Sequence, residues 1–180
     1  MAGHNKWSKV KHKKAATDAV KSKIFSKHSA VIAVESRKAS GDVNAPGLAA
    51  AIERAKKDSM PKDNIERAVA KGAGATGAAI DEVLYEGYGP GGVALMIQAV
   101  TDNNNRTAAE VRSAFSKSGL EMGTPGSAAW AFSKTDTGYT PNTPMDLDDE
   151  TGEKLAEFIE KLEDIDDVTD VYTAADTPEA

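Results

Sequence analysis

The spacing of apolar residues changes once along this chain, and that change limits the possible folds more than any other feature of the sequence. Up to residue 72, apolar residues recur three and four positions apart, as they do in helices. From Val83 onward, short apolar runs are bounded by glycine-rich turns, which is typical of strands. The Gly/Ala stretch 73–79 between them is expected to be a flexible linker. The 180 residues therefore predict an α+β protein with two units, 1–72 and 80–180.

The first unit is expected to be a helical bundle that is entered through a basic segment. Thr17 or Asp18 can cap a first helix that ends before Gly41. Pro46 and Pro61 each open a further helix, because proline is preset for a first helical turn. Gly72 stands where a left-handed residue would terminate the last helix.

The second unit is expected to follow the order β-β-α-β-α-β. Residues 83–85 and 93–100 should form a hairpin around the turn 87–92, and 107–110 has the spacing of a capping box that starts a helix. The remaining elements are a third strand, an acidic helix and a last strand, at 127–132, 155–162 and 168–172. This order predicts a mostly antiparallel sheet with helices on one face.

The net charge of −6 hides a strong asymmetry between the two ends of the chain. Residues 1–28 carry eight lysines against one aspartate, whereas residues 135–180 carry fifteen acids against two lysines. Such a separation indicates a basic segment that binds a polyanion and an acidic end that is repelled by it.

The basic segment interleaves aromatic and imidazole rings with closely spaced ammonium groups. Lysines neutralise phosphates and release counterions, and a tryptophan can stack on an exposed base. An alternative is a solvated tail in which the tryptophan packs against the bundle. The candidate nucleic-acid contacts are Lys6, Trp7, Lys9, Lys11, His12, Lys13, Lys14, Lys21, Lys23 and Lys27.

Arg106 is a second candidate contact, since it follows three asparagines at the start of an expected helix. The free amides and positive dipole end of such a helix attract anions, and a guanidinium matches a phosphate or carboxylate. The alternative is that Asn103–Asn105 only form a turn and a helix cap. Lys117 and Lys134 could widen the same patch.

Two glycine-rich or acidic stretches imitate ligand-binding loops without matching them. The turn 87–92 is followed by a strand and lacks a Gly-Lys-Ser/Thr ending, so a hairpin turn is favoured over a nucleotide site. The acids of 146–157 imitate a calcium loop, but Thr151 occupies the position that requires glycine. A helix start explains those acids better.

No residue pattern in the chain indicates catalysis, a cofactor or a metal site. There is no cysteine, and the histidines at positions 4, 12 and 28 match no zinc-binding or nucleophile motif. No apolar run approaches the length of a membrane span or a signal peptide core. We therefore expect a non-enzymatic cytoplasmic protein that binds no small-molecule substrate.

Five stretches together resemble the YebC family, whose relatives include a mitochondrial translational activator. They are MAGHNKWSKVKHKKAA (1–16), MPKDNIERA (60–68), YEGYGPGGV (85–93), TDNNNRT (101–107) and AEVRSAFSK (109–117). The resemblance implies a helical N-terminal domain followed by α/β domains, and a role in gene expression without catalysis. Family members usually carry one more small α/β domain after the strand matched by 127–132, whereas here 133–145 bridges directly to the final helix.

The function expected from the residues and the resemblance is nucleic-acid binding in gene expression. A ribosome- or RNA-associated translation factor is preferred, because lysine and histidine favour backbone contact over the reading of bases. The alternatives are a DNA-binding transcriptional regulator and a protein-interaction module whose acidic helix binds a basic partner.

Overall fold

The computed structural model describes residues 18–74, 80–136 and 138–176, and these form the expected α+β fold. The buried side chains make two separate hydrophobic clusters, one among the helices before the glycine-rich stretch and one in the sheet-containing part after it. We call these parts the helical region (18–74) and the α/β region (80–176). Among the residues described, no helix is long and apolar enough to cross a lipid bilayer.

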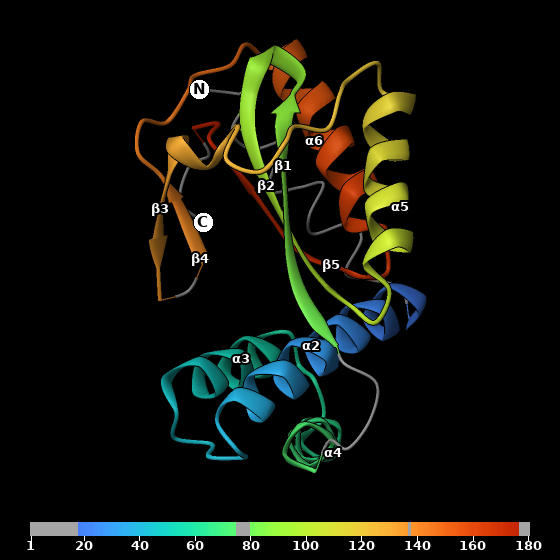
Figure 1. Cartoon of the computed structure of the whole chain (residues 1–180), viewed down its shortest axis with the longest axis vertical. Coiled ribbons are helices and arrows are strands. Elements are labelled where there is room, and N and C mark those ends of the chain that lie inside the picture. Colours follow the sequence, from blue (N-terminus) through green and yellow to red (C-terminus); the bar gives the residue numbers. More distant parts are fainter. Residues whose placement is uncertain (1–17, 75–79, 137, 177–180) are drawn as a thin grey trace.

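The helical region consists of α2 (Asp18–Lys38), α3 (Pro46–Lys57) and α4 (Lys62–Ala73), and α2 packs against both of the others (Figure 1). Both prolines act as predicted, since Pro46 begins α3 and Pro61 is the N-cap residue of α4. The core between these helices is made of small and medium side chains. It contains Ile32, Leu48, Ala51, Ala55, Met60, Ile65 and Ala68.

Gly72 lies inside α4, so the predicted left-handed terminating residue is wrong. A Cβ atom at this position would lie 2.2 Å from the carbonyl oxygen of Ala33 and 2.7 Å from the Cβ of Ser36. The glycine is therefore required by the close crossing of α2 and α4. Next to it, the buried Ser36 hydroxyl donates a hydrogen bond of 2.7 Å to the carbonyl of Val69.

The α/β region is built on a three-stranded antiparallel sheet in the order β1-β2-β5. The predicted hairpin and last strand are both present, and the turn of the hairpin is a short 3-10 segment, η1 (Pro90–Gly92). Two helices lie side by side on one face of the sheet (Figure 1). The elements are β1 (Asp81–Gly89), β2 (Val93–Thr101), α5 (Asn104–Lys117), α6 (Asp149–Glu163) and β5 (Val168–Thr173).

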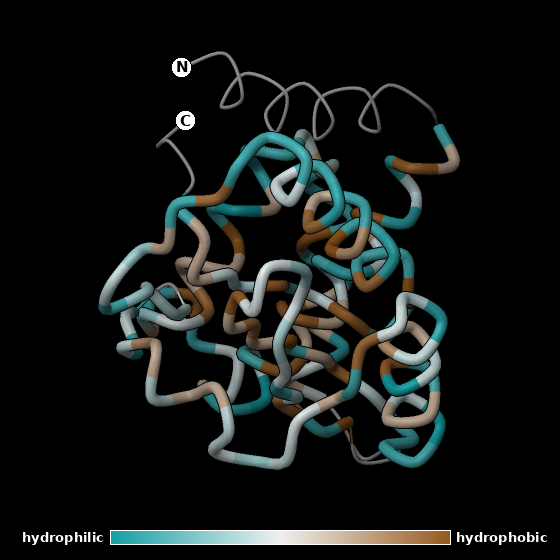
Figure 2. The backbone as a smooth tube through the Cα atoms, turned by 90° about the horizontal axis from the view of Figure 1, so that it is seen from above, coloured by the Kyte–Doolittle hydropathy of each residue, from teal (hydrophilic) through white to brown (hydrophobic). Residues whose placement is uncertain are grey.

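The core of the α/β region lies where α5 and α6 meet the central strand β2. Phe115 of α5 and Phe158 of α6 pack edge to face, with ring centroids 4.9 Å apart. Both rings are almost fully buried, and so are Leu155 and Leu162 of the predicted acidic helix. Along the backbone, hydrophobic segments concentrate toward the middle of the molecule and hydrophilic segments lie at its periphery (Figure 2).

The third strand predicted at 127–132 is wrong for most of its length. Residues before Phe132 form a loop and a 3-10 turn, η2 (Ala129–Ala131), and the strand β3 (Phe132–Thr135) only then begins. It pairs with β4 (Gly138–Pro141) in a separate two-stranded sheet. The backbone amides of Gly126, Ala128 and Ala129 donate hydrogen bonds to the Glu86 carboxylate, so this loop does not join the main sheet.

Candidate nucleic-acid interface

The predicted contacts of the basic segment divide into those outside the described residues and those on the first turns of α2. Outside lie Lys6, Trp7, Lys9, Lys11, His12, Lys13 and Lys14. Lys21 lies in the first turn of α2 and is exposed. Lys23 and Lys27 lie one helical turn apart on α2 and point to the same side of it.

Lys23 and Lys27 contact the α/β region of their own molecule. The Lys23 ammonium donates to the carbonyl of Asp164 and lies 3.4 Å from the carboxylate of Asp166. The Lys27 ammonium donates to the carbonyl of Glu163. Burial and the neighbouring Lys23 lower the pKa of Lys27 from its ordinary value, against the opposing field of Glu163. In the conformation described, these two lysines are engaged within the molecule, and their contact with nucleic acid stays a prediction.

The end of α6 explains why these two lysines are held. Its last carbonyls have no partner within the helix and carry the negative end of the helix dipole. Glu163, Asp164 and Asp166 add carboxylates to the same turn. Cations at such an end donate hydrogen bonds to the helix carbonyls and are attracted by the surrounding charge.

Further contacts between the two regions also pair a cation of the helical region with an oxygen of the α/β region. Arg54 of α3 lies 3.6 Å from the carboxylate of Asp170 on β5, and Lys38 at the end of α2 pairs with Glu82 on β1. The Arg37 guanidinium donates to the carbonyl of Ile80 at 3.4 Å. In each contact the cation belongs to the helical region and the oxygen to the α/β region. We call these contacts, with those of Lys23 and Lys27, the seam.

Arg106 is engaged within the molecule rather than presented to an anion. One nitrogen of its guanidinium donates to the carboxylates of Asp102 at 2.9 Å and Asp167 at 2.8 Å. These hydrogen bonds raise the pKa of Arg106 above its ordinary value. The backbone amide of Arg106 donates to the Asn103 side chain, which caps α5. Arg106 is therefore engaged by two carboxylates of its own molecule, and its contact with nucleic acid stays a prediction.

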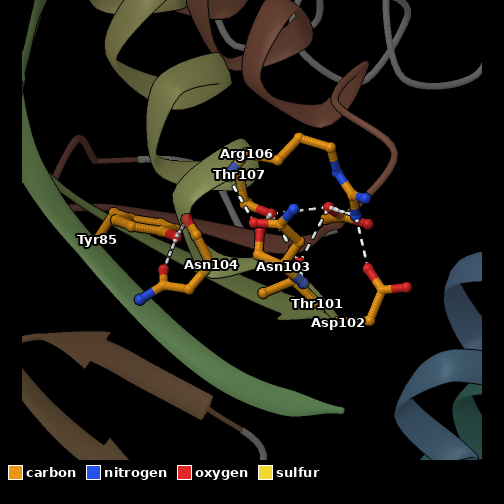
Figure 3. A network of polar contacts seen from close by, with 8 residues as sticks. Tyr85, Thr101, Asp102, Asn103, Asn104, Arg106 and Thr107 are labelled. Carbon is orange, nitrogen blue, oxygen red and sulfur yellow. Dashed lines mark hydrogen bonds and ion pairs between the residues drawn. The ribbon is translucent and has the colours of Figure 1, made fainter. Parts of the chain in front are cut away.

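The helix cap that the sequence placed at 107–110 is also wrong, because Thr107 is buried in the first turn of α5. Its hydroxyl lies 2.8 Å from the Thr101 hydroxyl and donates to the Asp167 carboxylate at 2.7 Å (Figure 3). Burial acts to raise the pKa of Asp167, but hydrogen bonds from Arg106 and Thr107 outweigh it and hold that pKa below its ordinary value. The polar motif around Arg106 therefore joins the ends of β2, α5 and β5.

The loop that Glu86 organises was not predicted from the sequence. This carboxylate is only 6% exposed, and it accepts backbone hydrogen bonds of 2.8 Å from Gly126, Ala128 and Ala129. The loop presents Trp130, which is 71% exposed and whose ring N–H donates to the Tyr88 hydroxyl at 2.9 Å. A pattern of local spacing cannot reveal this arrangement, because Glu86 lies forty or more residues from its partners.

The two regions carry opposite net charge. Residues 18–74 contain eleven Lys and Arg against seven Asp and Glu, whereas residues 80–176 contain six against twenty. Lys117 and Lys134, suggested as extensions of an Arg106 patch, are both exposed on the acidic α/β region. The described residues contain no group of His, Asp and Glu side chains that could hold a metal ion.

Comparison with known proteins gives matches over nearly all of the chain. The family model described as the TACO1/YebC protein N-terminal domain matches residues 5–75, and the model described as the TACO1/YebC second and third domain matches residues 80–137 and 133–175. A solved structure, the conserved hypothetical protein Aq1575 from Aquifex aeolicus, is 31% identical with a TM-score of 0.77. The alignment covers 91% of this chain and 93% of the Aquifex chain.

Three similar relatives are each named a probable transcriptional regulatory protein. The one from Trichlorobacter lovleyi is 46% identical over 175 residues, which is 96% of this chain and 70% of the relative. The one from Dictyoglomus thermophilum is 54% identical over 134 residues, 73% of this chain and 54% of the relative. The one from Francisella tularensis subsp. tularensis is 39% identical over 237 aligned positions, which cover 97% of this chain and 96% of the relative.

Proposed function

Because the chain belongs to the TACO1/YebC family, it is a regulator of gene expression, and we propose that it acts by binding nucleic acid through the basic start of its helical region. The curated relatives carry names of regulatory proteins rather than enzymes. Within the proposal, the phosphate-binding element is the basic segment from Lys6 to Lys21. Arg106 is left out, since two carboxylates already accept its hydrogen bonds.

The observation that carries this proposal is the separation of charge between the two regions. A polyanion is attracted to the helical region and repelled by the α/β region, whose acids outnumber its bases by twenty to six. The molecule therefore has one side suited to phosphates. The exposed Lys21 continues the basic segment onto that side.

The preferred target is RNA on the ribosome, with duplex DNA as the alternative. Lysine binds phosphate as a point charge and carries little information about bases, which suits a large, fixed RNA surface. The helix α4 carries the exposed Arg67 and the half-buried Asn64, two residue types that read base edges in a DNA groove. These two side chains hydrogen-bond to each other, which favours backbone contact over base reading.

We also propose that the β3–β4 turn stands where longer relatives carry additional residues. The alignment with the Francisella relative spans 237 positions, more than the 180 residues of this chain. The two matched segments of the second family model meet at residues 133–137, which include this turn. A short hairpin there supports a version of the fold in which an inserted domain is replaced by a turn.

Sucrose-gradient sedimentation of a cell lysate, with and without RNase, tests the preferred target. We expect the protein to migrate with ribosomes, and the variant with Lys9, Lys11, Lys13 and Lys14 changed to glutamate to remain at the top. A matched control changes Lys117, Lys134, Lys154 and Lys161 of the α/β region to glutamate, with the same change in net charge. Equal loss of ribosome binding in both variants would contradict a specific role for the basic segment.

The salt dependence of binding tests whether phosphates are contacted at all. If about six lysines meet phosphates, the slope of log K against log salt should be roughly −4 to −5. The measurement is fluorescence anisotropy with a labelled single-stranded RNA and a labelled DNA duplex. Tight, sequence-selective binding of the duplex, with no migration with ribosomes, would favour the transcriptional alternative.

A further inference from the structure

We propose that the acidic segment 163–170 occupies Lys23 and Lys27 in the place of nucleic-acid phosphates, so that nucleic acid must displace it to use the whole face of α2. This inference rests on the proposed function, because it names how access to the same basic element is controlled. The acidic segment thus competes with nucleic acid for these two lysines. Its release from them would loosen the helical region from the α/β region.

The chemistry of the contact supports this substitution. Lys23 and Lys27 point to one side of α2 and meet a row of oxygen acceptors: the carbonyls of Glu163 and Asp164, and the Asp166 carboxylate at 3.4 Å. A strand of nucleic acid presents the same kind of row, with anionic oxygens at regular intervals. The acidic segment thus presents to the lysines a row of oxygen acceptors similar to that of a phosphate backbone.

The arrangement of charges along α2 adds to the argument. Lys21 is exposed near the start of α2, whereas Lys23 and Lys27 contact the acidic segment a few residues later, on another side of the same helix. A polyanion that binds Lys21 and continues around α2 to Lys23 and Lys27 would therefore meet the acidic segment 163–170. Both cannot occupy the same ammonium groups, so each must weaken the binding of the other.

The contacts of Lys23 and Lys27 in the seam are weak enough for a ligand to displace. The Asp166 side chain is 91% exposed and that of Lys23 is 36% exposed, so salt and water screen their attraction. Lys27 is more deeply buried, and the accompanying fall in its pKa shows that its position desolvates the charged form. Moving this ammonium from the seam to a solvated phosphate would relieve that desolvation.

A charge-neutralising variant of the acidic segment provides the first test. The variant Glu163→Gln, Asp164→Asn, Asp166→Asn keeps the backbone carbonyls and removes the competing carboxylates. We expect it to bind a fluorescein-labelled, unstructured single-stranded RNA about five- to tenfold more tightly than the wild type at low salt. The control Asp136→Asn, Asp149→Asn, Glu157→Gln has the same change in net charge away from the seam and should change affinity less than about twofold.

Hydrogen–deuterium exchange of the full chain provides the second test, because a merely structural contact would not respond to the ligand. We expect peptides covering 163–170 to exchange faster when the same RNA is added, since their lysine partners have been taken. If wild type and variant bind the RNA equally and exchange at 163–170 is unchanged, the inference is wrong and the proposed function stands. If neither protein binds RNA or duplex DNA at low salt, the proposed function itself is wrong.

Discussion

The helical region and the α/β region differ both in what they bury and in what they expose. The helical core is made of alanines and medium-sized aliphatic side chains, whereas the α/β core centres on the paired rings of Phe115 and Phe158. At the surface, cations outnumber anions in the first region and the reverse holds in the second. The α/β region therefore has the larger, aromatic core, and the helical region carries the positive charge on which the proposed nucleic-acid binding depends.

The largest expected effect of a single change is in the α/β core. Phe158→Ala should lower the free energy of unfolding by about 3–5 kcal/mol, because the ring is almost fully buried and its loss leaves a cavity. Urea denaturation monitored by circular dichroism measures this. Met145→Ala, at an exposed apolar side chain, is the control and should cost less than about 0.5 kcal/mol. Equal effects would contradict the central place of Phe158 in the α/β core.

A smaller loss is expected at the buried charge that holds the Trp130 loop. Glu86→Gln should cost about 2–4 kcal/mol, since one amide oxygen cannot replace a carboxylate that accepts three backbone hydrogen bonds. Glu157→Gln, on the exposed side of α6, is the matched control and should be nearly neutral.

The same variant should change the acid stability of the protein. Burial raises the pKa of Glu86, but the amides of Gly126, Ala128 and Ala129 lower it more, so the net pKa lies below its ordinary value. The unfolded chain therefore takes up a proton near pH 4.3, above the pH at which the folded chain does. Wild-type stability should fall as the pH drops through this window, and Glu86→Gln should lack that part of the loss. An identical decline in both proteins would contradict the assignment.

The close crossing of α2 and α4 predicts a result of unusual sign. Replacing a helical glycine by alanine normally stabilises a helix by about 1 kcal/mol. Gly72→Ala should instead destabilise the protein by about 1–3 kcal/mol, because the new methyl group would meet the Ala33 carbonyl at 2.2 Å. Thermal denaturation measures the change, with Ala70→Gly on the exposed side of α4 as the reference for propensity alone. A gain in stability would show that the crossing can relax.

The smallest expected effect belongs to the seam. Lys38→Met should cost about 0.2–1 kcal/mol in dilute buffer, because the ion pair with Glu82 is partly exposed to solvent. The difference from wild type should shrink in about 1 M salt, where the screening length is near 3 Å. Lys56→Met, which removes an ion pair within α3, is the control for lysine loss outside the seam. If the loss of stability in Lys38→Met persists in high salt, the Lys38 side chain stabilises the seam by packing rather than by its charge.

Local patterns in the sequence predicted the features that depend on neighbours along the chain. The prolines at the starts of α3 and α4, the hairpin of β1 and β2, and the acidic start of α6 are of this kind. Each is governed by the backbone preference of a residue or by a helix dipole over one turn. The fold class followed from these elements.

The features that were missed depend on partners far away in the sequence. Thr107 looked like a helix cap, but Asp167 draws its hydroxyl inward, while Asn103 takes the capping role. The loop before Phe132 looked like a strand, but its amides turn to Glu86. The positions of Lys23 and Lys27 depend likewise on the end of α6. Long-range contacts of single polar side chains leave no periodic trace in a sequence.

The exposed indole on the Glu86-anchored loop gives this protein an intrinsic optical reporter. The chain has two tryptophans, so Trp7→Phe leaves Trp130 as the sole source of indole emission. That emission would be red-shifted and accessible to iodide even in the native state, since the ring is 71% exposed. Spectroscopists following the folding of this chain would then observe the release of one surface loop, and would need tyrosine signals or circular dichroism to follow the core.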